Sequence, residues 1–318
     1  MADFTRAPID TNGVYDVTIE EYHNNPNLCS GPCISAGGCQ TIESRSLAHF
    51  YEEWAGNPHA EKRDTQPMLL GRAAHAHMLG DEVFFERFAV LPFPDFRTNA
   101  AKDWRDKMVK SGKGVIKESD LETISAMGRT LRKHAVVTQG LLDGWQEISL
   151  IWKDKETGIW LRSRPDLVAR DLMGGDYKTT NDASPYSISR GIVDRGLHQQ
   201  AGMVMEAYEN VLEMKLENYV LIYQETKPPY AVNPVLLSPD AIARGRVLNR
   251  RAIRMFADAC ERNEWPGYAE RLTPLDTPLW YNQQFDKRQE EDQLPTYFEA
   301  GVTVAKPTES PDTYQPPN

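Results

Sequence analysis

A change of hydrophobic period in the middle of the chain constrains its fold more than any other feature. Apolar residues recur at helical spacing, then alternate with polar residues through three short segments divided by turns, and then return to helical spacing. The elements predicted here are a helix over 119–142, strands over 148–152, 160–169 and 175–179, a helix over 197–212, and strands over 219–224 and 231–237. The order α, βββ, α, β predicts a mixed α/β domain.

The flanking segments complete the predicted organisation. Shorter helices are expected over 47–54 and 67–78. Ser119 followed by Glu122 is typical of a capping box, and Ser238 before Pro239 predicts the start of a long helix that ends near residue 263. We therefore expect a domain over 43–285. A polar, loop-like segment over 1–42 precedes it, and an acidic, Pro-rich tail over 286–318, disordered beyond residue 306, follows it.

Two carboxylates and one ammonium group are predicted to meet on this sheet. Asp166 ends the apolar core of the second strand of the three, while Asp176 and Lys178 are two residues apart on the third and so share one face. A tight turn between the two strands brings Asp166 beside Asp176. An isolated Asp-x-Lys is usually only a surface ion pair, but paired carboxylates in this topology favour a site for Mg²⁺, which prefers oxygen ligands.

These residues belong to a set of motifs that resembles a known nuclease superfamily. Pro165-Asp166 and Asp176-Tyr177-Lys178 on an αβββαβ core resemble PD-(D/E)XK nucleases, and the further motifs resemble the RecB-like branch and, within it, the RecE-like (exonuclease VIII) exonucleases of phages and prophages. The further motifs are Gly71 to His75 (GxxxH), Asp176 to Thr180 (DYKTT), Gln200-Ala201, Glu147-Ile148-Ser149, Lys227 to Tyr230, and Trp265 to Tyr268. The fold that this resemblance implies is a PD-(D/E)XK core, a mixed sheet flanked by helices, with helical additions.

The resemblance implies an activity and its partners. A member of this family is a Mg²⁺-dependent exodeoxyribonuclease, with Mn²⁺ able to substitute, that degrades linear double-stranded DNA in the 5′-to-3′ direction. The product is a 3′ single-stranded tail for a single-strand annealing protein in phage-type recombination. The family also implies a homo-oligomeric ring, as trimer or tetramer.

The resemblance also implies a metal site. By position, His75, Asp166 and Asp176 are implied metal ligands, and Tyr177 is implied to contribute its backbone carbonyl. Two metal ions would stabilise charge on the attacking and leaving oxygens of the phosphodiester.

Three further residues have implied roles in the reaction. Lys178 positions the attacking water, Gln200 faces the scissile phosphate, and Glu147 is an additional or indirect metal carboxylate. One departure from the family pattern lies on the helix of Gln200. The family expects Tyr four residues later, where this chain has Val204, with Tyr208 one turn further on.

The net charge of −10 at first argues against a partner as anionic as DNA. Two segments are nevertheless basic. Residues 97–134 hold ten Lys or Arg against five Asp or Glu, and residues 244–254 hold five Arg and no acid. Arg250 and Arg251 are the predicted DNA-binding residues, with a solvated helix face as the open alternative.

Four cysteines leave a rival interpretation open. Some RecB-like nucleases hold an Fe–S cluster with one Cys before the core and three after it, whereas this chain has Cys29, Cys33 and Cys39 before and Cys260 after. We therefore expect free thiols rather than a cluster. The remaining alternatives are an endonuclease and a catalytically inactive module that binds DNA ends.

The expected location is the cytoplasm of a bacterial host cell, without a membrane partner. No run reaches the roughly 18 apolar residues of a membrane helix, and the N-terminus lacks the basic-then-apolar order of a signal peptide.

Overall fold

The computed structural model describes residues 6–60, 66–135, 137, 148–168, 173–269 and 271–291. The chain divides into two compact units, Met1–Tyr268 and Ala269–Asn318. The second unit holds one described helix, α11 (Leu279–Glu290), which buries none of its side chains. No described helix combines the length and the apolarity that crossing a lipid bilayer requires.

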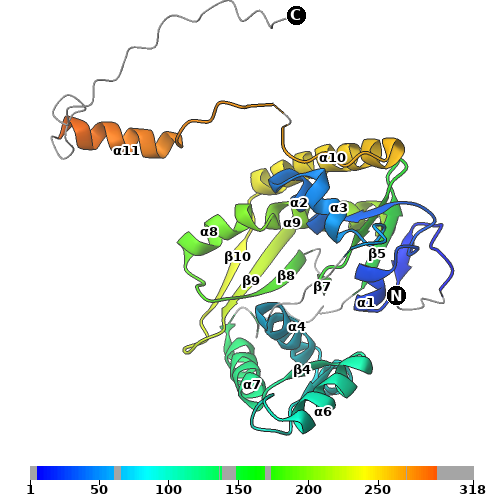
Figure 1. Cartoon of the computed structure of the whole chain (residues 1–318). Helices are drawn as coiled ribbons and strands as arrows, with labels where there is room; N and C mark the ends of the chain where they lie inside the picture. Colours follow the sequence, from blue (N-terminus) through cyan, green and yellow to red (C-terminus); the bar gives the residue numbers. More distant parts are fainter. Residues whose placement is uncertain are drawn as a thin grey trace, which may run out of the picture. The chain divides into compact units, whose positions relative to one another are not determined.

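The first unit contains two four-stranded sheets flanked by helices (Figure 1). The first sheet has the order β1-β5-β6-β2 and the second the order β10-β9-β8-β7. Their strands are β1 (Gly13–Tyr15), β2 (Cys33–Ser35), β5 (Ser149–Lys153), β6 (Trp160–Ser163), β7 (Leu167–Val168), β8 (Met173–Thr180), β9 (Asn218–Glu225) and β10 (Val232–Leu236). The helices are α1 (Ile19–Asn24), α2 (Ala36–Ser44), α3 (Leu47–Glu53), α4 (Gln66–Met78), α5 (Asp81–Arg87), α6 (Asn99–Lys110), α7 (Glu118–Lys133), α8 (Pro185–Asp194), α9 (Leu197–Ala207) and α10 (Pro239–Arg262).

The predicted three-strand run is divided between the two sheets. β5 and β6 form an antiparallel hairpin in the first sheet, whereas β7 and β8 pair antiparallel in the second. The predicted continuous strand over 160–169 is therefore wrong. It breaks at Arg164-Pro165-Asp166, where Pro165 has no N–H to donate to a ladder. This break places Asp166 between the two sheets.

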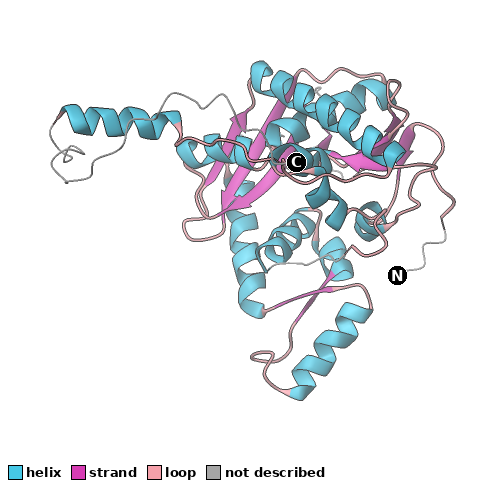
Figure 2. Cartoon of the chain, turned by 45° about the horizontal axis from the view of Figure 1, so that its top comes forward, coloured by secondary structure: helices cyan, strands magenta, loops and turns pink. Residues whose placement is uncertain are grey.

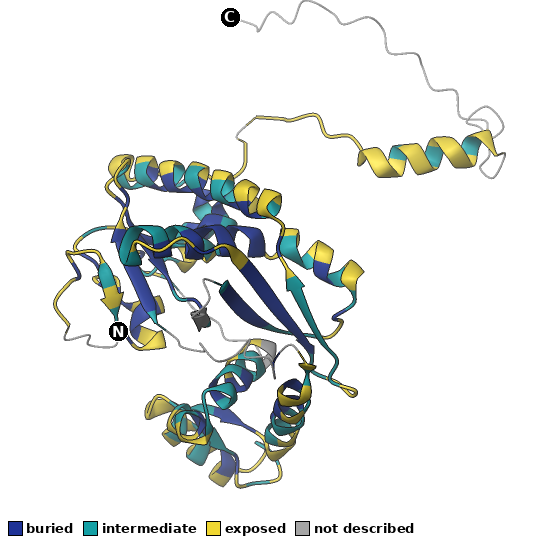
Figure 3. Ribbon diagram, turned by 180° about the vertical axis from the view of Figure 1, so that it is seen from behind, coloured by how far each residue is buried: buried dark blue, intermediate teal, exposed yellow. Residues whose placement is uncertain are grey.

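The second sheet is covered on both faces, as its alternating side chains require (Figure 3). In β9, Tyr219, Leu221 and Tyr223 pack in the cluster formed with α9 and α10. Val220 and Ile222 point the opposite way, into the cluster formed with α4 and α7. β8 therefore lies between two helical layers that can both supply side chains to it.

Helix α10 begins and ends where its sequence predicts. Ser238 accepts a hydrogen bond from the N–H of Ala241 at 3.2 Å, and Asn263 ends the helix in the left-handed conformation, with φ +55°. α10 crosses α9 at close range, because a Cβ built on Gly245 would lie 2.0 Å from the carbonyl oxygen of His198. Helix α9 continues into a π-helical turn over Tyr208–Leu212.

Two local predictions are wrong. The N-terminal segment forms more than loops, because β1 pairs with β5 and β2 pairs with β6. Helix α7 begins at Glu118, and the carboxylate of Asp120 accepts a hydrogen bond from the backbone N–H of Lys117 at 3.0 Å, where a box of Ser119 and Glu122 was predicted. The C-terminal end predicted for this helix and the disorder predicted beyond residue 306 lie outside the described residues.

A smaller lobe is built on helix α4 (Figures 1 and 2). Its strands β3 (Phe88–Val90) and β4 (Gly114–Ile116) are parallel, and α6 connects them. Phe88 packs in the same cluster as Ala73 and Ala74 of α4, and Leu69 of α4 packs against that cluster. The lobe therefore stands on the helix that carries His75.

Candidate active site

The register of β7 and β8 places two carboxylates side by side. Leu167 pairs with Gly175 in this antiparallel ladder, so Asp166 and Asp176 are opposite each other one step further along. The backbone N–H of Tyr177 donates a hydrogen bond to Oδ2 of Asp166 at 3.1 Å. The predicted meeting of Asp166 with Asp176 is thus confirmed.

Helix α4 brings His75 to the same carboxylate. Nδ1 of His75 lies 3.5 Å from Oδ2 of Asp166, and its ring centroid lies 5.2 Å from that of Tyr177. The approach depends on Gly71, one turn earlier, because a Cβ built there would lie 3.3 Å from Oγ1 of Thr179 on β8. The GxxxH spacing therefore combines a close helix–strand contact with a histidine aimed at the carboxylates.

Lys178 and Gln200 both contact Asp176, whose side chain is only 2% exposed. Nε2 of Gln200, on α9, donates a hydrogen bond to Oδ1 of Asp176 at 2.7 Å. Lys178 forms an ion pair with Oδ2, the other oxygen of the same carboxylate. The two helical layers thus each contribute one site residue, His75 from α4 and Gln200 from α9.

The pKa values of the two carboxylates are shifted in opposite directions. Burial and the neighbouring charge of Asp166 raise the pKa of Asp176 to about 7. Burial also acts to raise the pKa of Asp166, but the charges of His75 and Lys178 outweigh it, and that pKa lies well below its usual range. Two crowded carboxylates therefore resist ionising together.

The pKa values of the two basic side chains, His75 and Lys178, are both raised. Burial disfavours the charged form of His75, yet the charge of Asp166 raises its pKa. Burial likewise opposes the charge of Lys178, while Asp176 and Asp166 raise its pKa. Both groups favour an anionic partner at this position.

The donor set fits a hard divalent cation in kind. It offers carboxylate oxygens from Asp166 and Asp176 and an imidazole nitrogen from His75, and Oδ2 of Asp176 is buried with the ammonium of Lys178 as its ion-pair partner. Within the described part of the chain, no three His, Cys, Asp or Glu side chains are close enough together to form a metal site by themselves. The ammonium of Lys178 balances the charge of Asp176, and a bound cation would lie beside the same carboxylate.

Supporting residues that sequence reasoning missed hold these side chains in place. The hydroxyl of Tyr177 donates to Oε1 of Gln224 at 2.6 Å, and Nε2 of Gln224 donates to the carbonyl of Met127 on α7 at 2.9 Å. Gln224 is fully buried near the end of the apolar strand β9. A lone amide after an apolar run is the feature of the sequence that could have indicated this role. A buried amide without an obvious partner in sequence indicates a contact made in three dimensions.

The loop of Asp166 is held by the N-terminal segment. Nη1 of Arg164 donates to the carbonyl of Val17 at 2.8 Å and to Oγ of Ser149 at 2.9 Å. These contacts link residues far apart in the sequence, so no local pattern predicts them.

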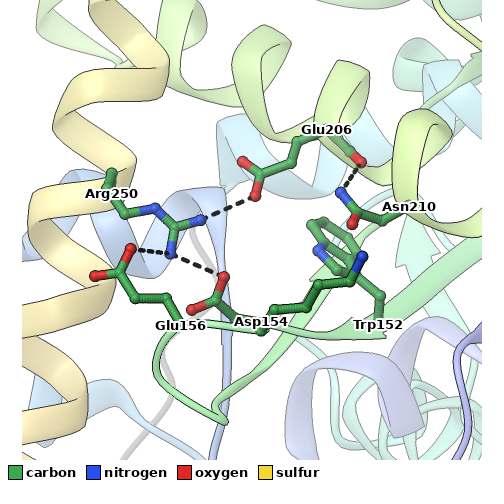
Figure 4. Close-up of a pocket in the computed structure, with 7 residues that line it drawn as sticks. Trp152, Asp154, Glu156, Glu206, Asn210 and Arg250 are labelled. Carbon is green, nitrogen blue, oxygen red and sulfur yellow. Dashed lines mark hydrogen bonds and ion pairs between the residues drawn. The ribbon is translucent and has the colours of Figure 1, made fainter.

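The arginines predicted to bind DNA lie on α10, which packs on α9, on the opposite side of the sheet from α4 (Figure 1). Arg250 donates to Oδ1 of Asp154 at 2.8 Å and to Oε1 of Glu206 at 3.1 Å, beside a cavity of about 300 Å³ (Figure 4). Nη1 of Arg251 lies 3.1 Å from a carboxylate oxygen of Glu43. The structure therefore does not bring this pair to the carboxylate site, and acids of the chain already occupy both guanidinium groups.

The remaining predicted positions are scattered. Glu147 lies outside the described residues. Cys29, Cys33, Cys39 and Cys260 are all free thiols. Cys29 and Cys33 pack in the cluster of the N-terminal segment, whereas Cys39 packs in the large cluster of α9 and α10.

Together, the mixed sheet between helical layers and the Asp166, Asp176 and Lys178 constellation define a domain of PD-(D/E)XK nuclease type. The sequence profile described as "PDDEXK-like domain of unknown function (DUF3799)" matches residues 39–277. The chain belongs to this family.

One solved structure agrees with the fold. A crystal structure from Eubacterium rectale, described as a "putative exonuclease", is 9% identical with a TM-score of 0.55, covering 83% of this chain and 96% of that one. An alkaline exonuclease from Laribacter hongkongensis is 9% identical with a TM-score of 0.23, covering 60% of this chain and 91% of its own. No curated protein sequence matches the chain.

Proposed function

We propose that this protein is a divalent-metal-dependent exodeoxyribonuclease that acts on linear double-stranded DNA. The observation that carries the proposal is the pairing of Asp166 with Asp176 beside Lys178, with His75 against Asp166. These four side chains come from one strand, a helix and the link between two sheets. Phosphodiester hydrolysis needs such a set of anionic ligands together with a positioned cation.

Each site residue has a proposed role that follows from the atoms it contacts. A bound Mg²⁺ or Mn²⁺ would supply Lewis acidity and lower the pKa of a bound water. Asp166 and Asp176 would hold it, with His75 and the carbonyl of Tyr177 as further ligands. Gln200 fixes Oδ1 of Asp176 by its hydrogen bond and so leaves Oδ2 directed at Lys178.

Lys178 is the group placed to orient the attacking water. Its ammonium contacts the carboxylate that would bind the cation, so it would lie close to a water bound to that cation. An ammonium donates hydrogen bonds and offers positive charge to the developing oxyanion.

The finer assignment follows from the order of motifs. We infer a RecE-like enzyme that degrades in the 5′-to-3′ direction, leaves 3′ single-stranded tails for an annealing protein, and works as a homo-oligomeric ring in the cytoplasm of a phage-infected or prophage-carrying bacterium. Its support is that GxxxH, Pro165-Asp166, DYKTT and Gln200 lie around one site.

One assay tests both levels. Linear duplex labelled separately at each 5′ and 3′ end is incubated beside a closed circle, with Mg²⁺, Mn²⁺, Ca²⁺ or EDTA. We expect degradation of the linear duplex alone, with Mg²⁺ or Mn²⁺, and release of the 5′ label first. Ca²⁺ should support binding without cleavage, because its looser coordination holds the water poorly for in-line attack.

The other outcomes reject the proposal in distinguishable ways. Cleavage of the circle would indicate an endonuclease. Binding of ends without hydrolysis in any metal would indicate an inactive end-binding module, and release of the 3′ label first would overturn the polarity alone.

A further inference from the structure

The lobe on α4 carries an aromatic side chain that the hydrophobic core does not use. Phe96 lies half-buried in the link between β3 and α6, and it belongs to none of the hydrophobic clusters formed by the described residues. The guanidinium carbon of Arg105 and Nζ of Lys117 each lie 6.0 Å from its ring centroid. Two cations from two different elements therefore lie over the ring, at the outer limit of cation–π contact.

The surroundings of Phe96 are basic, unlike the chain as a whole. Residues 95–117 hold seven Lys or Arg and three Asp, a net charge of +4 in a chain of net charge −10. Two of the acids are already engaged, because Asp95 pairs with Arg97 and Asp106 pairs with Arg105.

One exposed lysine extends the cationic rim of the ring. Lys102 is exposed and precedes Arg105 by three residues on α6, so it lies on the same side of that helix. Neither Lys102 nor Lys117 makes an ion pair with any carboxylate that the structure describes. The charge of Lys102 is therefore available to an external anion, and the charge of Lys117 acts on Asp95 without forming an ion pair with it.

We propose that Phe96, with Lys102, Arg105 and Lys117, is a binding platform for single-stranded DNA. A partly exposed ring offers a face on which an unpaired base can stack, and the lysines lie beside it to contact the phosphates. A duplex would not use the ring in this way, because its bases are already stacked on each other. The identity of the ligand rests on the proposed nuclease function.

The position of the lobe connects the platform to the active site. Phe88 and Ile116 of its two strands share a hydrophobic cluster with Ala73 of α4, the helix that carries His75. The ring and the carboxylates are thus parts of one compact unit. A strand held on the lobe would lie on the same side of the sheet as His75.

A binding titration tests the platform without requiring hydrolysis. The full chain is titrated in EDTA against a fluorescein-labelled oligothymidylate of about 16 nucleotides, the upper end of single-strand site sizes. We expect Phe96→Ala and Phe96→Leu to weaken binding by about tenfold or more, whereas Phe96→Tyr keeps the ring and retains it. Phe85→Ala, which removes another exposed ring of the same lobe, is the matched control and should leave binding unchanged.

The lysines give an independent measurement that does not depend on packing. Lys102→Gln should reduce the slope of log K against log salt by about 0.7, the value for one phosphate contact to a single strand. Lys107 is also exposed, but it lies two residues after Arg105 and faces away from it, so Lys107→Gln should leave the slope unchanged.

The proposed platform is rejected if Phe96→Leu and Lys102→Gln both bind oligothymidylate as tightly as the unaltered protein does. It is also rejected if the control variants lose as much affinity as the test variants. Equal weakening of oligothymidylate and of blunt duplex would overturn the assignment to single strands. Nuclease activity is measured separately on labelled duplex. A protein that cleaves nothing but binds oligothymidylate through Phe96 would reject the nuclease and keep the platform, and the reverse result would do the opposite.

Discussion

Oδ2 of Asp166 accepts a hydrogen bond of 3.1 Å from the backbone N–H of Tyr177. This contact ties the carboxylate that follows the break after β6 to the middle of β8, and the same oxygen lies 3.5 Å from Nδ1 of His75. One oxygen atom therefore joins a loop, a strand and a helix. The site is specified by the meeting of these elements, so substitutions that move any of them should be felt at the carboxylates.

Lys178→Ala should remove most hydrolysis while leaving the fold and DNA binding nearly intact. The ammonium pairs with the carboxylate of Asp176, and Asp176 can take up a proton when Lys178 is removed, since its pKa is already raised to about 7. We expect the single-turnover rate to fall by about 10²-fold or more, the usual contribution of a positioned proton-handling group. Lys155→Ala, on the turn between β5 and β6, is the control. A near-normal rate in Lys178→Ala would contradict the role assigned to it.

His75→Ala should weaken metal binding by at least about tenfold, since even residues that only support a ligand contribute that much. Titration calorimetry with Mn²⁺ measures the change directly. His77→Ala is the matched control on the same helix, because its ring packs edge-on against Phe84 at 5.8 Å. Equal metal affinity in the His75 variant and the unaltered protein would place the metal site elsewhere.

The meeting of Asp166 with Asp176 and Lys178 was predictable from the sequence because its main constraint is local. Asp166, Asp176 and Lys178 lie within one strand pair, and the period-2 alternation of β8 with a short return from β7 decides how they meet. The start of α10 was equally predictable, since Ser238 and Pro239 act within one turn of it.

What the sequence could not show depends on distant partners. β1 and β2 are three residues long, and they become strands only because β5 and β6 lie beside them. Trp265, read as part of a nuclease motif, stacks on Tyr51 at 4.5 Å, more than 200 residues earlier in the chain. The five arginines of residues 244–254 appeared free in sequence, but the fold places acidic side chains against four of them. Glu43, Asp154 and Glu206 contact Arg250 or Arg251, Glu209 pairs with Arg246, and Glu156 pairs with Arg254.

Gly71→Ala should lower activity more than stability. Alanine in a helix interior is more favourable than glycine by about 0.5–1 kcal/mol, which offsets part of the cost of crowding Oγ1 of Thr179 at 3.3 Å. The added methyl group should still push α4 away from β8, and this displacement moves His75 away from Asp166. Thr179→Ala removes the crowded atom, so the double variant should recover cleavage relative to Gly71→Ala. A double-mutant cycle on cleavage rate, with thermal melts in parallel, measures this coupling; strictly additive effects would exclude the contact.

Asp154→Asn should lose stability in a manner that depends on pH. Burial acts to raise the pKa of Asp154, but hydrogen bonds from Thr157 and Arg250 outweigh it and hold that pKa below its ordinary value. A carboxylate with a depressed folded-state pKa stabilises the protein fully above its unfolded pKa of about 3.9, and this contribution disappears as the pH falls through the folded value. We expect Asp154→Asn to cost about 1–2 kcal/mol in urea unfolding at pH 7 and progressively less below about pH 4. Asp103→Asn, an exposed aspartate of α6, should change stability little at any pH. A cost for Asp154→Asn that stays constant down to pH 3 would show that the Arg250 pairing does not stabilise the fold through charge.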